Sequence, residues 1–250
     1  VNGGDPRFGG RTPVPLSSEG EISSAARGVE RWPVTLPTGE TEVSIASQRP
    51  TAAWATLVLA HGAGAGFDHP FLVGFAEALA HAGIATVRFN FPYREAGRRM
   101  PGPASHAIAT WRAVVDRARG EAPAGEPVWA AGKSYGGRLA SVTEAERPLG
   151  IAGLVYLGYP LHPPGDPTKE RAEHLPRIAV PQLFVEGTND PFVVPHEGLE
   201  RAVSTCQDAQ LTWIEGGGHS FEVKGQKRPA DEVGAALAPL VADFLRARQL

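Results

Sequence analysis

One serine of this chain stands in a context that favours nucleophilic chemistry. Ser134 is the central residue of Gly-Lys-Ser-Tyr-Gly at 132–136, a G-x-S-x-G pattern that directly follows the apolar run 127–131. The run predicts a buried strand, and the residues from about Arg138 onward predict a helix. At such a tight turn the serine Oγ stands clear of the backbone, and a bulky residue in place of either glycine would clash with the neighbouring elements. The pattern predicts a nucleophile elbow.

The acid and the base that a serine nucleophile needs follow it along the chain. Asp190 comes after the apolar run 181–185, and His219 lies on a glycine-rich loop after the short apolar run 211–214. Serine is a weak nucleophile near its own pKa, so we expect His219 to take its proton and later to deliver one to the leaving group. Asp190 would fix the imidazole tautomer and stabilise the imidazolium. The order Ser, Asp, His therefore predicts a catalytic triad.

A glycine-rich loop upstream predicts an oxyanion hole. His-Gly-Ala-Gly-Ala-Gly at 61–66 follows the apolar run 55–60. We expect the backbone N–H groups of Ala63 and Tyr135 to bind the oxyanion, with Gly64 replacing Ala63 if the loop is shifted by one residue. The competing interpretation is a dinucleotide-binding loop, which requires G-x-G-x-x-G and an acidic residue after the next strand. Neither is present, so we expect no cofactor.

Residues that could bind substrate lie on the long loop 90–101, which leaves the carboxyl edge of the predicted sheet. Tyr93, Arg94, Arg98 and Arg99 could recognise a carboxylate or phosphate there. The alternative is a solvated loop in which Arg94 pairs with Glu95 or another acid.

Lys133, inside the elbow, is also unusual. We favour an ion pair between this lysine and an acid behind the sheet over a role in lowering the pKa of a neighbouring group.

Alternating apolar strands and amphipathic helices predict a single α/β domain over 29–250, with a mostly parallel sheet flanked by helices. Residues 1–28 are rich in Gly, Pro, Ser and Arg and predict a flexible tail. We expect a hairpin of 31–36 and 41–46, the second an edge strand; further strands at 85–89 and 151–157; and helices at 70–81, 105–119 and 229–248. Roughly twenty residues, 158–180, separate two consecutive strands. They leave no room for a multi-helix lid, so we expect an open, shallow site.

The composition of the chain limits the kinds of partner that we expect it to bind. The formal net charge is −3, no apolar run approaches the roughly 20 residues that span a bilayer, and no secretory signal is recognisable. We therefore expect neither nucleic acid nor membrane as a partner. The single cysteine, Cys206, cannot form an intramolecular disulfide, which fits a cytoplasmic location. The histidines show no metal-ligand spacing, and we expect no metal. An exposed edge strand would permit either a monomer or a homodimer.

Taken together, these motifs resemble one small family. The resemblance rests on five motifs: Leu-Ala-His-Gly-Ala-Gly-Ala at 59–65, Phe-Asn-Phe-Pro-Tyr at 89–93, Gly-Lys-Ser-Tyr-Gly-Gly-Arg at 132–138, Glu-Gly-Thr-Asn-Asp-Pro-Phe at 186–192 and His-Ser-Phe at 219–221. The chain resembles, over about 55–245, the compact α/β-hydrolase-like family of predicted bacterial hydrolases. This family is related to dienelactone hydrolases, and its animal relatives include a subunit of a chromatin-modifying complex. The resemblance implies an α/β-hydrolase fold and carries the three catalytic roles to Ser134, Asp190 and His219.

Two functions remain open at this stage. The complete triad favours a serine hydrolase that cleaves small esters or thioesters through an acyl-enzyme. The alternative is a non-catalytic binding or scaffold protein that keeps the fold, for which the family includes precedents. The dienelactone hydrolases carry a cysteine nucleophile where this chain has serine, so the resemblance does not extend to their substrate.

Overall fold

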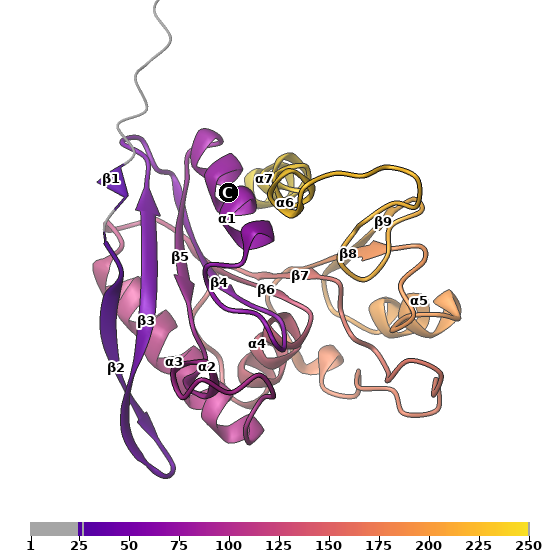
Figure 1. Cartoon of the computed structure of the whole chain (residues 1–250), viewed down its shortest axis with the longest axis horizontal. Helices are drawn as coiled ribbons and strands as arrows, with labels where there is room; N and C mark the ends of the chain where they lie inside the picture. Colours follow the sequence, from indigo (N-terminus) through magenta and orange to yellow (C-terminus); the bar gives the residue numbers. More distant parts are fainter. Residues whose placement is uncertain (1–24, 27, 250) are drawn as a thin grey trace, which may run out of the picture.

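Nine strands of the described residues form one sheet, in which the six central strands are parallel. The structure is a computed structural model that describes residues 25–26 and 28–249. The strand order is β1-β3-β5-β4-β6-β7-β8-β9, with β2 paired to β3 (Figure 1). The strands are β1 Ala25–Ala26, β2 Glu30–Leu36, β3 Gly39–Arg49, β4 Ala55–Ala60, β5 Ile84–Phe89, β6 Val128–Lys133, β7 Leu154–Leu157, β8 Gln182–Gly187 and β9 Ala209–Ile214.

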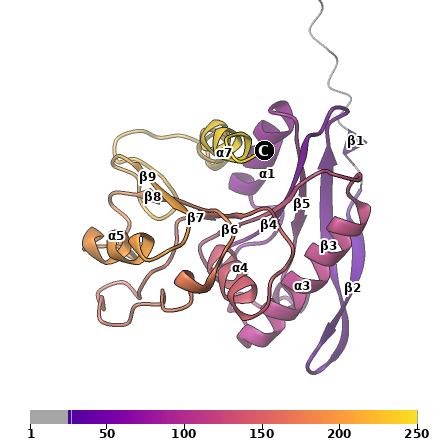
Figure 2. The ribbon, with the colours of Figure 1, turned by 180° about the vertical axis from the view of Figure 1, so that it is seen from behind.

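Helices cover both faces of the sheet, because the central strands are apolar on both sides. They are α1 Pro70–His81, α2 Pro92–Glu95, α3 Ala104–Glu121, α4 Tyr135–Glu146, α5 His196–Ser204, α6 Ala230–Ala235 and α7 Ala238–Arg246, with a 3₁₀ turn η1 at Leu175–Arg177. One core lies between the sheet and α1, α6 and α7, and the other lies under α3, α4 and α5 (Figures 1 and 2). The predicted mostly parallel sheet flanked by helices is confirmed.

The predicted hairpin forms, but its second strand is not at the edge of the sheet. β3 pairs with β2 and β1 on one side and with β5 on the other, all antiparallel. The expectation of an edge strand at 41–46 is therefore wrong, because alternating burial arises wherever one face of a strand is covered, inside a sheet as well as at its edge. The predicted tail falls mainly on residues 1–24, outside the described residues, and Ala25–Ala26 pair with β3.

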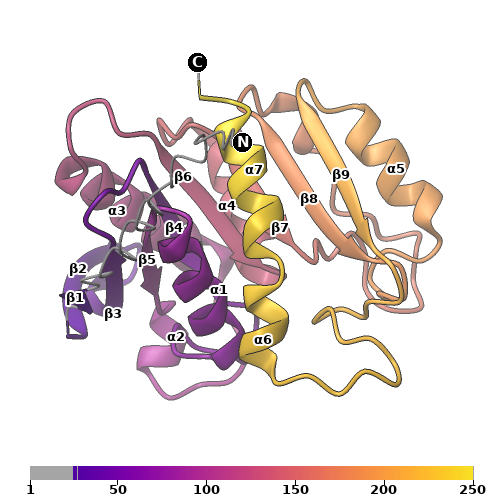
Figure 3. The same cartoon turned by 90° about the horizontal axis from the view of Figure 1, so that it is seen from above.

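The predicted helix 229–248 is two helices. α6 ends at Ala235 and α7 begins at Ala238, with a proline in its first turn. That residue is Pro239, which has no N–H to donate and whose ring would clash with the carbonyl four residues earlier, so a continuous helix cannot form. The two helices run end to end beside α1 (Figure 3). At the crossing of α1 and α6, a Cβ on Gly234 would lie only 2.0 Å from the Phe71 carbonyl oxygen.

Candidate active site

The turn between β6 and α4 has the strained geometry that the sequence predicts. Ser134 joins the two elements with φ 49° and ψ −115°, a conformation that is costly for a residue with a Cβ. The flanking glycines are sterically required: a Cβ on Gly132 would lie 2.1 Å from the Gly137 nitrogen, and one on Gly136 would lie 2.6 Å from the His61 carbonyl oxygen. The helix begins at Tyr135, three residues earlier than the sequence indicated.

Ser134, His219 and Asp190 form a continuous hydrogen-bonded chain, although they come from three loops at the carboxyl edge of the sheet. The Ser134 Oγ lies 2.8 Å from His219 Nε2, and His219 Nδ1 lies 2.6 Å from Asp190 Oδ2. Asp190 is fully buried, and its other oxygen accepts a hydrogen bond from the Phe192 N–H at 2.8 Å. The ring of Phe192 lies against the imidazole, with 4.2 Å between the centroids. The imidazole is thus held from its edge and from its face.

The environment of His219 favours the neutral imidazole. Burial lowers the pKa of His219, and this effect outweighs the hydrogen bond that His219 donates to Asp190, which acts in the opposite direction. The neutral ring carries its proton on Nδ1, where Asp190 accepts it, and leaves the Nε2 lone pair facing the Ser134 hydroxyl. A general base for serine must be in this form at neutral pH.

Lys133 reaches across the site to the histidine loop. Its Nζ donates a hydrogen bond to the His219 carbonyl oxygen at 2.6 Å. Burial lowers the pKa of Lys133 from 10.5 to about 8, against the attraction of Asp190, Glu186 and Glu222. The sequence suggested an ion pair for this residue; the direct contact is instead with a backbone carbonyl of the loop that carries the base.

Glu186, at the end of β8, is fully buried, as Asp190 is. One of its oxygens accepts a hydrogen bond from the Tyr159 N–H, while the other has no hydrogen-bond partner. Burial raises the pKa of this carboxyl well above its usual range, and the attraction of Lys133 opposes that shift only in part. This environment therefore favours the protonated acid.

The predicted oxyanion loop lies beside the elbow. A Cβ on Gly62 would lie 3.6 Å from the Ser134 Cβ, and Ala63 lines the same cavity as Ser134. His61 anchors the loop from below: its Nδ1 lies 2.7 Å from the Gly62 carbonyl oxygen, and its Nε2 accepts a hydrogen bond from the Phe91 N–H. Tyr135 is the first residue of α4, so its N–H belongs to the free end of the helix.

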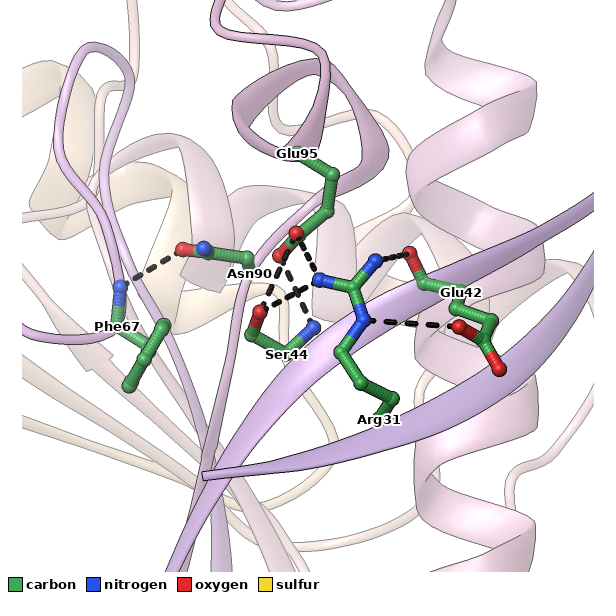
Figure 4. A network of polar contacts seen from close by, with 6 residues as sticks. All are labelled: Arg31, Glu42, Ser44, Phe67, Asn90 and Glu95. Carbon is green, nitrogen blue, oxygen red and sulfur yellow. Dashed lines mark hydrogen bonds and ion pairs between the residues drawn. The ribbon is translucent and has the colours of Figure 1, made fainter. Parts of the chain in front are cut away.

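A polar network ties the far end of this loop to the hairpin (Figure 4). The Phe67 N–H donates to Asn90 Oδ1 at 2.9 Å, and Glu95 accepts hydrogen bonds from the Ser44 N–H at 3.0 Å and from Arg31 Nη1 at 2.5 Å. Burial alone would raise the pKa of Glu95, but hydrogen bonds, including one from the Asn90 side chain, outweigh it and lower the pKa. The network fixes α2 and the end of β5 next to the oxyanion loop.

The residues predicted to bind substrate do not line the cavity beside Ser134. Tyr93 is buried, and its ring packs 5.8 Å from that of His61, so it supports the loop from beneath. Arg94 does not pair with Glu95; its Nη1 donates to the Arg98 carbonyl oxygen. Within the described part of the chain, the residues that line the cavity next to Ser134 do not include Gly64, Tyr93, Arg94, Arg98 or Arg99.

The cavity beside Ser134 has a volume of about 460 Å³. Its walls come from the oxyanion loop, the first turn of α1, the loops that carry Phe192 and His219, and α6. Between β7 and β8, the described residues contain no helix other than η1, so no multi-helix lid covers the site. Without such a lid, α1 and α6 still stand beside the serine and form part of the cavity wall. This wall could not be predicted from the sequence, because it depends on where α6 packs.

The described residues were also compared with the requirements of a metal site and of a membrane-spanning helix, and they meet neither. Among residues 25–26 and 28–249, no group of three or more His, Cys, Asp or Glu side chains is arranged to hold a metal ion. No helix within the same described ranges combines the length and the hydropathy that crossing a bilayer would require.

Comparison with known proteins shows the family to which the chain belongs. A family model described as an alpha/beta hydrolase domain matches residues 53–245. The chain belongs to this alpha/beta hydrolase family. Solved alpha/beta hydrolases with similar structures include a dienelactone hydrolase from Anabaena variabilis, which is 23% identical with a TM-score of 0.67, covering 88% of this chain and 98% of the other. An alpha-beta serine hydrolase homologue from Coxiella burnetii is 21% identical with a TM-score of 0.66, covering 86% and 97%.

A third similar structure is a serine hydrolase without a lid, from Xanthomonas campestris. It is 20% identical with a TM-score of 0.64, covering 86% of this chain and 94% of the other. At such identities these likenesses show a shared alpha/beta hydrolase fold.

Proposed function

We propose that the protein is a serine hydrolase that cleaves small esters or thioesters through an acyl-enzyme, with Ser134, His219 and Asp190 as its triad. The observation that carries the proposal is the pair of hydrogen bonds at 2.8 Å and 2.6 Å that joins the three side chains at a strained elbow. A serine, a base and a buried acid at these distances form the arrangement that activates a hydroxyl for attack on a carbonyl.

In the first half-reaction, His219 Nε2 accepts the Ser134 hydroxyl proton as Oγ attacks the substrate carbonyl carbon. The carbonyl oxygen gains negative charge, and the N–H groups of Ala63 and Tyr135 stabilise it. The imidazolium, held by Asp190, then gives its proton to the departing alcohol or thiol as the tetrahedral intermediate collapses to an acyl-serine.

In the second half-reaction, His219 takes a proton from water, and the resulting hydroxide equivalent attacks the acyl carbon. Collapse of the second intermediate returns the proton to Ser134 Oγ and releases the acid. No metal or cofactor enters either step. Because burial lowers the pKa of His219, the base is ready for both half-reactions at neutral pH.

The test is labelling with a fluorophosphonate, measured by intact mass, on the wild type, Ser134→Ala and Ser204→Ala. Ser204 is a control because it lies on the outer helix α5, and its hydroxyl donates only to the Arg201 carbonyl oxygen. We expect one adduct on the wild type and on Ser204→Ala, and none on Ser134→Ala, which should also lose ester hydrolysis while melting near the wild-type temperature. Folded wild-type protein that takes no label would refute the proposal and favour a binding role.

A further inference from the structure

The cavity beside Ser134 has a wall made mainly of carbon atoms. Phe71 and Leu72 contribute from α1, Ala230 and Val233 from α6, and Phe192 from the loop after Asp190. A cavity of about 460 Å³ falls within the range of small-molecule sites. The wall would therefore exclude water from an apolar group that enters it, and it offers few hydrogen-bond partners to a polar one.

The first turn of α1 borders this cavity, and a helix N-terminus ordinarily attracts anions. Here its donors are already used. Pro70 has no N–H; the Phe71 N–H donates to His69 Nδ1 at 3.3 Å; and the N–H groups of Leu72 and Val73 donate to the His69 carbonyl oxygen at 2.8 and 3.1 Å. A substrate carboxylate would find no free N–H in this turn.

The cations that border the cavity are also engaged. Lys133 Nζ donates to the His219 carbonyl oxygen at 2.6 Å. Arg228 lies along α6, where its Nη2 donates to the Glu232 carbonyl oxygen at 3.1 Å and its Nε lies 3.8 Å from Glu232 Oε2. Glu222 adds a carboxylate to the lining. Among the described residues, the lysine and the arginine that line the cavity are thus each bonded within the protein, and an anion entering the cavity would meet the like charge of Glu222.

Building on the proposed function, we propose that this cavity binds the uncharged, apolar acyl or alkoxy group of an ester and discriminates against substrates that carry a carboxylate. The apolar wall between α1 and α6 sets the preferred length of that group. A carboxylate is disfavoured because the N–H groups of the first turn of α1, and the cations of Lys133 and Arg228, already have partners within the protein. The basic loop 94–99 takes no part in this selection, because its arginines lie outside the cavity lining among the described residues.

The first test uses the wild-type enzyme and two substrate series: p-nitrophenyl acetate, butyrate and hexanoate, and the acetates of ethanol, butanol and hexanol. In at least one series we expect kcat/KM to rise by about fourfold per added methylene until the cavity is full, as burial of about 0.8 kcal/mol per CH₂ implies. The p-nitrophenyl hemisuccinate should react at least tenfold more slowly than the butyrate. A flat response in both series, or a hemisuccinate that matches the butyrate, would overturn the inference.

A matched pair of variants locates the selectivity. Ala230→Phe places a ring at the cavity wall on the exposed first position of α6, and Ala236→Phe places the same ring at the exposed end of that helix, outside the lining. We expect Ala230→Phe to lower the ratio of kcat/KM for the longest preferred ester to kcat/KM for p-nitrophenyl acetate at least tenfold. Ala236→Phe should keep the wild-type ratio. Equal selectivity in the two variants would contradict the assignment of the wall.

Fluorophosphonate labelling separates the two proposals. Wild-type protein that takes the label and hydrolyses p-nitrophenyl acetate, but shows no chain-length or charge preference, would retain the proposed function and lose only this inference. Protein that neither takes the label nor hydrolyses any ester would lose both.

Discussion

Replacing Lys133 with methionine should stabilise the fold while slowing catalysis. Methionine has a similar unbranched shape and no charge. The pKa of this lysine falls from 10.5 to about 8 because it is buried. At about 1.4 kcal/mol per pH unit, holding the ammonium in the folded protein costs about 3 kcal/mol below pH 8. Loss of the hydrogen bond to the His219 carbonyl oxygen offsets about 1–2 kcal/mol of the gain. We therefore expect a net stabilisation of about 1–2 kcal/mol at pH 7.

The gain should depend on pH with a defined sign. Between about pH 8 and 10.5 the unfolded wild-type chain keeps a lysine proton that the folded protein has lost. The free energy of unfolding of the wild type therefore rises through this window relative to the variant. Urea unfolding at pH 7, 8, 9 and 10 should show the advantage of Lys133→Met in full at pH 7, lost near pH 9, and reversed by about 1 kcal/mol at pH 10. Lys224→Met, at an exposed lysine, is the control and should show no such trend.

The catalytic effect should run the other way. Without the lysine the loop that carries His219 loses its contact with the elbow, and a small displacement of a catalytic base can cost up to about 100-fold in rate. We expect kcat of Lys133→Met to fall at least tenfold with KM within about twofold. A stability difference that is the same at every pH, together with wild-type kcat, would refute the reasoning on both counts.

Three further outcomes are expected. The acidic limb of the kcat/KM profile should lie below pH 6.5, because burial lowers the pKa of His219 and the active base is the neutral form; a limb above that pH would contradict this. In urea titrations at pH 7, Glu95→Gln should lower the free energy of unfolding by about 1–2 kcal/mol, because Arg31 loses a charged acceptor. The pKa of Glu95 is lowered in the folded protein, so this deficit should shrink as the pH falls below 4.5. Gly234→Ala should lower the free energy of unfolding by about 1–3 kcal/mol in the same assay, because its Cβ would lie 2.0 Å from a carbonyl oxygen of α1. The control is Gly102→Ala, which has open space around the new Cβ and should cost little.

The sequence was most informative where chemistry imposes a local pattern. The elbow could be predicted because a Cβ at position 132 would lie only 2.1 Å from the Gly137 nitrogen, which leaves glycine as the residue that fits beside the strained serine. The loops of Asp190 and His219 could be predicted because each follows an apolar strand in a fixed order. The break at Pro239 was also visible in the sequence, and the expected helix 229–248 overlooked it.

The remaining features depend on packing between distant segments. Lys133 and His219 are 86 residues apart, and no periodicity indicates that one will contact the carbonyl of the other. The position of β3 between two partners and the apolar wall formed by α6 likewise depend on how elements assemble, which local propensity does not encode. The same limit explains the emphasis on the basic loop 94–99: three arginines within six residues indicate an anion site only if their side chains reach the cavity.

The wall formed by α6 has a consequence for how the molecule is made. Ser134 and the oxyanion loop precede α6 and α7 in the chain, so they leave the ribosome before these two helices do. Until α6 docks against α1 at Gly234, the nascent sheet leaves the apolar surface of that core exposed to solvent or to a chaperone. The cavity beside Ser134 is complete only after α6 has docked, so a chain interrupted before α6 would carry the serine without this part of the cavity wall.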